Sequence, residues 1–483
     1  MPLSFSHLRP IAPAQGLPLY RQLYQRFRES IADGRLQPGD RVPAARALAA
    51  ELNLSRGTVD AAYQLLLGEG YLVSHGAAGT RVSPQLAAAL PIRAAVPPAA
   101  PERPPVHGGA GPLDLQLGLP ALDAFPRKLW TRVMGRELRQ GGTASLVYPE
   151  ARGHAGLRQA IAGYLGISRG IACHPDQVFI CAGYRACLDL IGHTLVQPGD
   201  QCWLEEPGYF MAREVLSQAG LELVPVAVDA HGLDVAQGIA RARHARFAVV
   251  TPTHQSPLGM SLSLPRRQAL LEWANRQASW IIEDDYDSEY RYLGRPLPAL
   301  KSLDDQGRVL YTGTFSKVLF PGLRLAYLVV PPAQVQAFAH QADRLHNHSP
   351  HLQQASVAGF LNEGHFARHL NKMRQLYKQR RQWLVQALQR QFGERLALNP
   401  GAGGMHLVAG LRSAAGDCDL AQRAQAAGLA VEPLSRWYLG PGAAQGLLMG
   451  FTNIADAAQA AQVARRLYEA IQGDGLQPVG DWP

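Results

Sequence analysis

One lysine in this sequence stands where its amine can do covalent chemistry. Lys317 closes the run Tyr-Thr-Gly-Thr-Phe-Ser-Lys at 311–317, directly after an apolar segment, and Arg324 follows seven residues later. A lysine amine forms a Schiff base with an aldehyde when it is partly desolvated and held by a fixed turn, which a strand followed by a loop supplies. The alternative is an ordinary solvated loop lysine. The neighbouring motifs must decide between these two interpretations.

A short apolar strand in the run at 280–290 ends in acidic residues and a tyrosine. Asp284 at such a strand end would point into the crevice of an α/β sheet, where an acid keeps a pyridine nitrogen protonated. Tyr286 could then hydrogen-bond an oxygen on the same ring. A calcium loop is excluded, because Tyr290 stands in place of the required glycine and Pro296 in place of the bidentate glutamate. A solvated acidic loop remains the alternative.

Three other predicted strands also end in polar or glycine-containing turns. Gly183 separates an apolar strand from a helical segment, and such a turn can offer backbone N–H groups to a phosphate. Tyr209, at the end of Glu-Glu-Pro-Gly-Tyr, can stack on a flat ring or pack in the core. His254 follows the strand pattern at 247–250 and can equally be an ordinary hydrogen-bonded histidine.

Taken in order along the chain, these parts resemble the fold-type I aminotransferases, the class of aspartate aminotransferase, over residues 113–470. The resemblance implies pyridoxal 5'-phosphate as cofactor, with Lys317 as the Schiff-base lysine and Asp284 as the partner of the pyridine nitrogen. It implies that Tyr286 donates to the ring oxygen and that Tyr209 stacks on the ring. The implied phosphate cup consists of Gly183, Tyr184, Arg185, Thr314, Ser316 and Arg324. Tyr148 resembles the tyrosine that reaches the phosphate of a neighbouring subunit, which would make a dimer part of the site.

Two departures from this class bear on activity. Ser256 stands where the class has the asparagine of Asn-Pro-x-Gly, so a ring-oxygen contact is altered or passes to His254 or Gln255. Residues 447–451 read Leu-Leu-Met-Gly-Phe where the class has an Arg-x-Gly/Ser-Phe strand that binds the substrate carboxylate. Arg436 is the nearest candidate for contact with an effector, and a surface arginine is the alternative. We therefore expect no physiological turnover, although residual transaminase activity is compatible with the motifs.

Residues 17–83 carry three helical patterns followed by a short β pattern. The first has its apolar residues on one face, the second opens at Pro43, and Ser55 caps the third. Residues 71–82 alternate like a hairpin with a glycine-rich tip. This order predicts a winged helix-turn-helix, whose last helix would set Arg56 and Thr58 against base edges in the major groove. A generic three-helix bundle is the alternative.

Several short motifs in this region resemble those of GntR-type regulators and favour the DNA-binding interpretation. They begin at Arg46 (Arg-Ala-Leu-Ala), Ser55 (Ser-Arg-Gly-Thr-Val), Ala62 (Ala-Tyr), Glu69 (Glu-Gly-Tyr-Leu) and Gly76 (Gly-Ala-Ala-Gly-Thr). The resemblance implies DNA contacts from Arg46, Ser55, Arg56, Thr58, Gly79 and Thr80. Residues 1–83 hold nine arginines, no lysine and six acidic residues, so charge supports this only mildly.

The stretch at 84–112 holds eight prolines and eight alanines in 29 residues and is predicted to be an extended linker. It separates a predicted α+β winged helix-turn-helix domain at 1–83 from an α/β aminotransferase-like domain at 113–483. This combination resembles the MocR/GabR-type regulators. The resemblance implies a head-to-tail homodimer with exchanged domains that binds double-stranded DNA at two half-sites. It also implies that an amine effector, or the cofactor itself, is sensed through an aldimine.

Two other functions stay open at this point. One is an active aminotransferase that carries an accessory DNA-binding domain, and the other is a cofactor-free regulator whose large domain is only a dimerisation scaffold. The five cysteines are odd in number and show no Cys-x-x-Cys spacing, which predicts a reducing cytoplasm and neither disulfides nor a zinc site. No leader and no run of eighteen apolar residues is found, so no membrane partner is expected. The effector, the target genes and the direction of regulation are not encoded in any motif.

Overall fold

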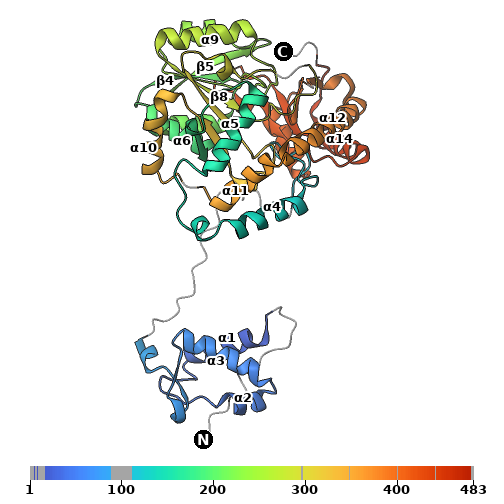
Figure 1. Ribbon diagram of the computed structural model, residues 1–483. Coiled ribbons are helices and arrows are strands. Elements are labelled where there is room, and N and C mark those ends of the chain that lie inside the picture. Colours follow the sequence, from blue (N-terminus) through green and yellow to red (C-terminus); the bar gives the residue numbers. More distant parts are fainter. Residues whose placement is uncertain are drawn as a thin grey trace. The chain divides into compact units, whose positions relative to one another are not determined.

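The chain forms two units, Met1–Gly108 and Gly109–Pro483, each with its own hydrophobic core. The computed structural model describes residues 5, 8, 17–88, 111–294, 297–347, 349–399, 401–440 and 442–479. Figure 1 shows the helices and strands of both units. Of the predicted linker at 84–112, Pro84–Ala88 form a short 3-10 helix, while residues 89–110 lie outside the described part. The predicted domain boundaries therefore stay predictions.

The described residues of the first unit form three α-helices followed by a two-stranded antiparallel sheet. Its elements are α1 (Leu19–Ala32), α2 (Ala45–Leu52), α3 (Arg56–Gly68), β1 (Leu72–Ser74) and β2 (Thr80–Val82). Asn53 ends α2 in the left-handed region (φ 55°), and Ser55 caps α3 by accepting a hydrogen bond from the backbone N–H of Thr58 at 3.1 Å. This is the predicted order of a winged helix-turn-helix.

The core of this unit lies between α1 and α3. The Phe27 and Tyr63 rings meet edge to face with centroids 5.6 Å apart, and the Tyr63 hydroxyl donates to the Pro43 carbonyl. The buried residues of α3 form one stripe along the helix: Val59, Ala62, Tyr63 and Leu66. This packing leaves the N-terminal turn of α3 exposed.

The second unit is built on an eight-stranded sheet in the order β3-β10-β9-β8-β7-β4-β5-β6. The strands are β3 (Val178–Cys181), β4 (Gln201–Glu206), β5 (Glu222–Asp229), β6 (Gly232–Leu233), β7 (Phe247–Val250), β8 (Trp280–Asp285), β9 (Val309–Thr314) and β10 (Ala326–Val329). From β5 to β9 the neighbours β5, β4, β7, β8 and β9 are parallel, and β10 runs antiparallel to both β9 and β3. The central strands β7 and β8 are buried along their whole length, because both faces of the sheet are covered.

Helices cover the two faces of this sheet (Figure 1). On one face lie α6 (Tyr184–Leu195), α7 (Phe210–Gln218) and α10 (Val335–Arg344), which share a core with Trp280 and Ile282 of β8. On the other lie α8 (Val235–Ala242) and α9 (Leu264–Gln277), which pack on Ile281. Successive residues of β8 therefore point to opposite faces, as a strand requires.

A smaller C-terminal subdomain packs beside the large sheet. Its four-stranded antiparallel sheet has the order β11 (Ala397–Asn399), β12 (His406–Gly410), β14 (Gly446–Gly450) and β13 (Glu432–Pro433). The remaining helices are α4 (Arg127–Gln140), α5 (Ala155–Arg169), α11 (His351–Asn362), α12 (His365–Phe392), α13 (Asp417–Ala426) and α14 (Ala457–Ile471). One continuous core joins α5, α11 and α12 to the small sheet.

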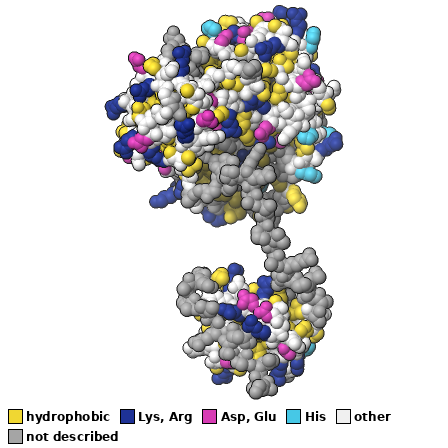
Figure 2. Space-filling view, turned by 180° about the vertical axis from the view of Figure 1, so that it is seen from behind, with side chains coloured by type: hydrophobic (Ala, Val, Ile, Leu, Met, Phe, Trp, Pro, Cys, Tyr) yellow, Lys and Arg dark blue, Asp and Glu magenta, His cyan; other side chains and the backbone are white. Residues whose placement is uncertain are grey.

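The surface carries both signs of charge. Figure 2 shows basic and acidic side chains interspersed over the visible face of the larger unit. None of the helices in the described ranges combines the length and the apolar composition that crossing a bilayer demands.

Candidate functional site

The strand directions of the large sheet bring the predicted site residues to one edge. Ala326, the first residue of β10, pairs with both Cys181 and Thr314, the last residues of β3 and β9. Because β4, β7, β8 and β9 are parallel, their C-terminal ends lie at this same edge. The loops that leave or enter this edge carry Gly183, Tyr209, His254, Tyr286, Lys317 and Arg324.

Lys317 lies in the loop after β9 with its amine buried. Its Nζ donates to the carbonyl of Gly118 at 2.9 Å. Burial lowers the pKa of the Lys317 amine, while Asp287 and Asp284 act in the opposite direction. Gly118 has φ 73°, and a Cβ at this position would collide with Nζ. The lysine is thus not the solvated loop residue of the alternative interpretation.

Asp284 points to the site, whereas the acidic residues on either side of it in β8 do not. Glu283 accepts hydrogen bonds from the backbone N–H groups of Leu300 and Lys301, and Asp285 accepts one from the Tyr311 hydroxyl at 2.6 Å. Asp284 is 8% exposed. Burial, and after it the charge of Asp285, raises the pKa of Asp284 to about 8.

His254 holds Tyr286 from the loop after β7. Its Nδ1 lies 2.9 Å from the Tyr286 hydroxyl and 3.0 Å from Oδ1 of Asp287, a carboxylate that is 1% exposed. The ring is enclosed by Gly404 and Gly259, since a Cβ on Gly404 would overlap the imidazole and one on Gly259 would lie 3.2 Å from Nε2. Burial, followed by the charge of Asp287, raises the pKa of Tyr286 well above its usual value.

The structure shows which of the two residues before Ser256 contacts Tyr286. Of the two candidates for the altered contact, His254 meets Tyr286, whereas Gln255 is engaged elsewhere. The Gln255 amide donates to the carbonyl of Pro207 at 2.8 Å and to Oε2 of Glu205 at 3.2 Å. The sequence alone left both candidates open.

The turn between β3 and α6 forms a cradle with Arg324. Gly183 has φ 104° and leaves the first N–H groups of α6 without a side-chain cap. Arg324 has φ 51°, an unusual conformation for a residue with a side chain, and its Nη2 donates to the carbonyl of Ala182 at 3.1 Å. A Cβ on Gly183 would lie 3.0 Å from the same nitrogen, so only glycine leaves room here. Free helix N–H groups beside a guanidinium are suited to a phosphate.

The other predicted cup residues lie around this turn. The Ser316 N–H donates to Oγ1 of Thr314 at 3.1 Å. Arg185 pairs with Glu214 at 3.6 Å in a partly exposed position. The buried Tyr184 hydroxyl lies next to the Asp284 carboxyl, and the Tyr184 ring lies 6.2 Å from that of Tyr209.

Tyr209 leads into α7 at the same edge of the sheet. Its ring lies 5.9 Å from that of Trp437, between centroids, and burial raises its pKa to about 12. It therefore touches the small subdomain as well as the phosphate turn.

Two of the predicted site residues, Arg436 and Tyr148, do not lie with the others at this edge of the sheet. The Arg436 side chain is 59% exposed, and its Nη1 pairs with Oε2 of Glu432 at 3.2 Å. Tyr148 is 93% exposed, next to the exposed Leu146 and Val147. Their roles stay predictions.

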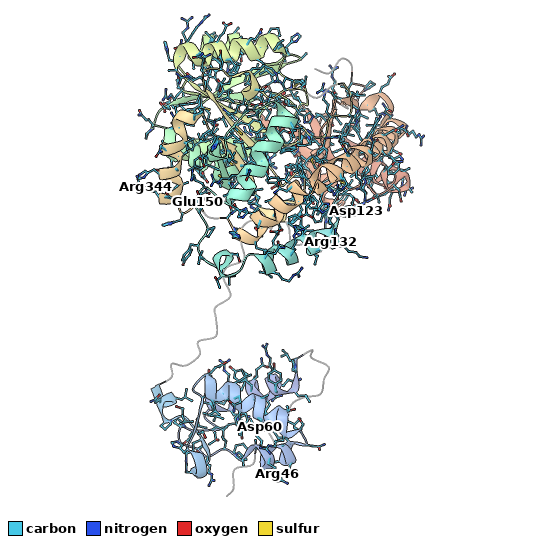
Figure 3. The ribbon with its side chains drawn as sticks, in the orientation of Figure 1. Arg46, Asp60, Asp123, Arg132, Glu150 and Arg344 are labelled. Carbon is cyan, nitrogen blue, oxygen red and sulfur yellow. The ribbon has the colours of Figure 1, made fainter. Side chains whose placement is uncertain are left out.

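The predicted DNA-contacting residues gather on α2, the start of α3 and the wing. Arg46 projects from α2, and Asp60 lies on α3 (Figure 3). Arg56 is exposed and pairs with Asp60 at 3.3 Å. Gly79 has φ 92° at the wing tip, and Thr80 opens β2.

Sequence reasoning missed three residues that contact these groups. Gly118 lies 199 positions before the lysine that it contacts, so no local pattern indicates it. Asp287 was visible only as one acid among several. Arg41 lies against the wing, because a Cβ on Gly79 would be 3.1 Å from its Nε. The excess of arginine was the only signal for Arg41.

Comparison with known proteins agrees with both units. Residues 117–444 match the aminotransferases of class I and II, and residues 19–82 match the gntR family of bacterial regulatory proteins. The chain is 38% identical to the probable rhizopine catabolism regulatory protein MocR of Rhizobium meliloti, over 91% of each chain. The chain belongs to the MocR-type transcriptional regulators. A second relative of this MocR-type chain is the pyridoxine biosynthesis regulator PdxR of Corynebacterium glutamicum, 34% identical over 92% of this chain and 94% of PdxR.

Solved structures resemble the larger unit of the MocR-type chain. An archaeal alanine:glyoxylate aminotransferase gives a TM-score of 0.70 at 25% identity and covers 76% of this chain and 92% of its own. LysN, the α-aminoadipate aminotransferase of Thermus thermophilus, gives 0.68 at 29% identity, with 75% and 92% covered. The predicted fold-type I aminotransferase fold and winged helix-turn-helix are confirmed.

The fold and these neighbours imply pyridoxal 5'-phosphate as the cofactor of this MocR-type chain. The residues fit it. A buried amine at Lys317 and an acid of raised pKa at Asp284 are groups that an aldehyde and a pyridine nitrogen can engage. The backbone cradle at Gly183 suits the phosphate.

Proposed function

We propose that this protein is a DNA-binding regulator whose aminotransferase-like unit senses a small amine, or the cofactor itself, at Lys317. One observation carries the proposal: a single chain holds an exposed recognition helix and a sheet edge where a buried amine, an acid and a phosphate-type cradle meet. An active aminotransferase with an accessory DNA-binding domain is less favoured. The strand that supplies a carboxylate-binding arginine in that class has Leu448 in its place.

The site residues have distinct roles in this proposal. When bound, pyridoxal 5'-phosphate supplies an aldehyde that combines with primary amines and a ring that withdraws electrons. Lys317 is the chain's own amine for that aldehyde. Asp284 would pair with the pyridine nitrogen, Tyr286 would donate to the ring oxygen and Tyr209 would cover the ring. The residues that would bind the phosphate are Gly183, Tyr184, Arg185, Thr314, Ser316 and Arg324.

Asp287 decides which nitrogen of His254 carries the proton. Its Oδ1 lies at Nδ1 of His254, and a buried carboxylate favours a proton there, because it would otherwise face the nitrogen lone pair. A protonated Nδ1 is a donor, so it cannot accept the hydrogen of the Tyr286 hydroxyl. That hydrogen is then free to be donated to the cofactor. Asp287 and His254 are therefore positioning residues for Tyr286.

Lys317 also connects the site to the backbone that follows the predicted linker. If an effector amine took the place of Lys317, its Nζ would be free to donate to the Gly118 carbonyl, as it does in this structure. The segment around Gly118 is bonded to the small subdomain, since the Gly450 N–H donates to the Leu115 carbonyl and the Ala430 N–H to that of Asp114, both at 2.8 Å. Effector binding thus acts on a segment next in sequence to the linker. Regulation further requires that the two states bind the effector unequally.

We further propose a homodimer with a head-to-tail arrangement and exchanged domains. Leu146, Val147 and Tyr148 are 76%, 66% and 93% exposed, and adjacent exposed apolar side chains are typical of an interface. The partner's cofactor phosphate would give the Tyr148 hydroxyl a contact. Two DNA-binding units in a dimer would bind two half-sites. Light scattering on the wild type and on L146D tests the interface, with a monomeric variant expected.

The regulatory proposal is tested with the full chain loaded with pyridoxal 5'-phosphate and with DNA that it selects from a random library. Footprinting should show two protected half-sites, and a sensed amine should change the DNA affinity of the wild type. K317A should bind DNA without this response, because its site holds no amine that the effector can replace. An equal response from K317A would contradict the role of Lys317.

A further inference from the structure

The small sheet turns one of its faces to the cofactor site. His406 pairs with Gly450 and Val408 with Leu448 in the antiparallel ladder of β12 and β14. Residues two apart in a strand share a face, as do direct cross-strand partners, so these four residues lie on one face. What this face offers determines what a ligand at Lys317 can carry.

His406 shows that this face borders the site. Its ring lies 5.8 Å from that of His254, between centroids, and its Nε2 is 2.8 Å from the carbonyl of Pro257. Burial, followed by the charge of His254, lowers the pKa of His406 to about 4. Lys317 contributes in the same direction, which places the lysine within electrostatic reach. At neutral pH His406 is therefore uncharged.

Leu448 occupies the position where the class has its carboxylate-binding arginine. It is fully buried in an apolar cluster with Val408, Leu434 and Trp437. The residues that flank this cluster include Tyr209 and Leu258, both in loops of the site, and Leu117, which precedes the partner of Lys317. The wall beside the predicted cofactor ring is thus aliphatic and aromatic.

The arginines near this wall are already engaged. Arg213 donates to the carbonyls of Arg436 at 2.6 Å and Tyr438 at 3.0 Å. Arg436 is paired with Glu432 at the surface. Glu206, which accepts hydrogen bonds from the N–H groups at 439 and 440, adds a negative charge to this region. An anionic group on a ligand would face this wall with no free cation among these residues.

We infer that the effector is a primary amine whose body carries no carboxylate or sulfonate where it meets Leu117, Tyr209 and Leu258, the partly buried residues packed against the Leu448 cluster. This inference rests on the proposed function and narrows its ligand class to neutral amines with an apolar or weakly polar body. Burying an anion without a partner costs several kcal/mol, whereas an aliphatic or aromatic body gains contact with the wall. An α-amino acid of the same side chain should bind more weakly.

Matched pairs of ligands test this on the full chain loaded with pyridoxal 5'-phosphate. Isoamylamine is compared with leucine, and phenethylamine with phenylalanine, by the concentration that gives half of the change in cofactor absorbance. We expect each amine to act at a concentration at least ~10-fold lower than its amino acid. The ammonium group of a simple amine is less acidic than that of an amino acid, so a smaller fraction of the simple amine is unprotonated and reactive. This difference in reactive fraction works against the expected result.

Two variants sharpen the test. L448R restores a cation on this face and should shift the preference toward the amino acid by ~10-fold or more, whereas L448M, which keeps the apolar wall, should retain the preference for the amine. R436A should behave as the wild type. Loss of an amino-acid response in R436A would mean that Arg436 binds a carboxylate, and it would overturn the inference.

The outcomes separate this inference from the proposed function. Equal or tighter response to the amino acids in the wild type overturns the ligand class alone and leaves amine sensing in place. If neither ligand of any pair changes the absorbance of bound cofactor, amine sensing at this site is refuted, and the ligand class with it. The wild-type comparison stands even if L448R does not fold.

Discussion

Replacing Asp284 by Asn tests whether this carboxyl serves a cofactor rather than the stability of the chain. Its pKa is about 8 in the folded chain, raised by burial and then by Asp285, and returns to about 3.9 on unfolding. Ionising it therefore costs the folded chain up to about 5 kcal/mol at pH 8. Local relaxation lowers this cost, so we expect about 2 to 5 kcal/mol.

The folded chain binds the Asp284 proton more tightly than the unfolded chain does. The contribution of Asp284 to the free energy of unfolding therefore falls as the pH rises from about 4 to about 8, and it is constant above pH 8. D284N cannot ionise and lacks this fall. The cofactor-free variant should thus exceed the wild type in stability at pH 8, and the difference should close toward pH 4.

Urea unfolding followed by tryptophan fluorescence measures this in the full chain. No tryptophan precedes Trp130 in the sequence, so the signal comes from the larger unit alone. Adding pyridoxal 5'-phosphate should stabilise the wild type far more than D284N, because only the wild type pairs the pyridine nitrogen with a carboxylate. D285N is the matched control and should lose about 3 to 5 kcal/mol, since it removes the carboxylate charge 3.0 Å from the buried Arg169 and leaves Arg169 with the longer pair to Glu289 at 3.6 Å. Cofactor-free D284N that is no more stable than wild type at pH 8 would refute the reasoning.

Three further substitutions probe separate contacts. G118A should weaken cofactor binding at least ~10-fold in a cofactor titration, because the added Cβ meets Nζ of Lys317. It should also cost about 1 to 2 kcal/mol of stability in thermal melting, because φ at this position is 73°. D287N should weaken cofactor binding ~10-fold in the same titration, since the amide no longer selects the Nδ1 proton of its histidine partner, and an unchanged affinity would speak against that role. R56A should lower DNA affinity by about 1 to 3 kcal/mol in anisotropy titrations while leaving cofactor absorbance as in the wild type.

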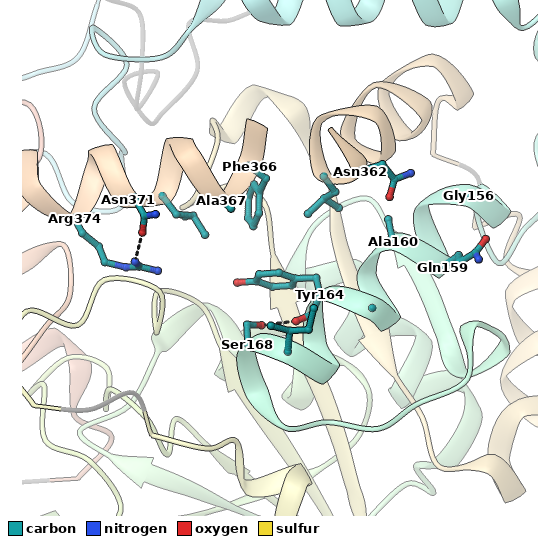
Figure 4. Close-up of a pocket in the computed structure, with 14 residues that line it drawn as sticks. Gly156, Gln159, Ala160, Tyr164, Ser168, Asn362, Phe366, Ala367, Asn371 and Arg374 are labelled. Carbon is teal, nitrogen blue, oxygen red and sulfur yellow. Dashed lines mark hydrogen bonds between the residues drawn. The ribbon is translucent and has the colours of Figure 1, made fainter. Parts of the chain in front are cut away.

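The larger unit also carries a groove on the other side of α5. A groove of about 650 Å³ runs between α5 and α12 and is lined by Tyr164, Ile167, Phe366 and Arg374 among others (Figure 4). The Tyr164 hydroxyl donates to Glu289 at 2.9 Å.

Local patterns predicted the elements and most of the sheet edge. The strand ends near Gly183, Asp284 and Lys317 can be predicted from the sequence, because an apolar run stops there and polar residues begin. Parallel strands then bring these ends together. The helix cap at Ser55 and the buried stripe of α3 can also be predicted, because both depend on residues that are close in sequence.

Contacts between distant segments were beyond these patterns. The Gly118 carbonyl reaches Lys317 only because the segment after the linker folds back over the site. Arg436 looked suited to an effector, yet Glu432 lies four positions earlier and pairs with it at the surface. The choice of His254 over Gln255 likewise depended on Glu205 and the Pro207 carbonyl, which engage the glutamine.

The most direct test of the account asks which lysine takes the cofactor. The chain has five lysines, and Lys301 is an internal control, because burial lowers its pKa as well while its Nζ donates to the Val309 carbonyl, away from any phosphate cradle. The full chain is incubated with pyridoxal 5'-phosphate, reduced with borohydride, digested and examined by mass spectrometry. The account predicts one phosphopyridoxyl group, on the peptide that contains Lys317. An unmodified Lys317, or modification spread over the other lysines, would contradict it.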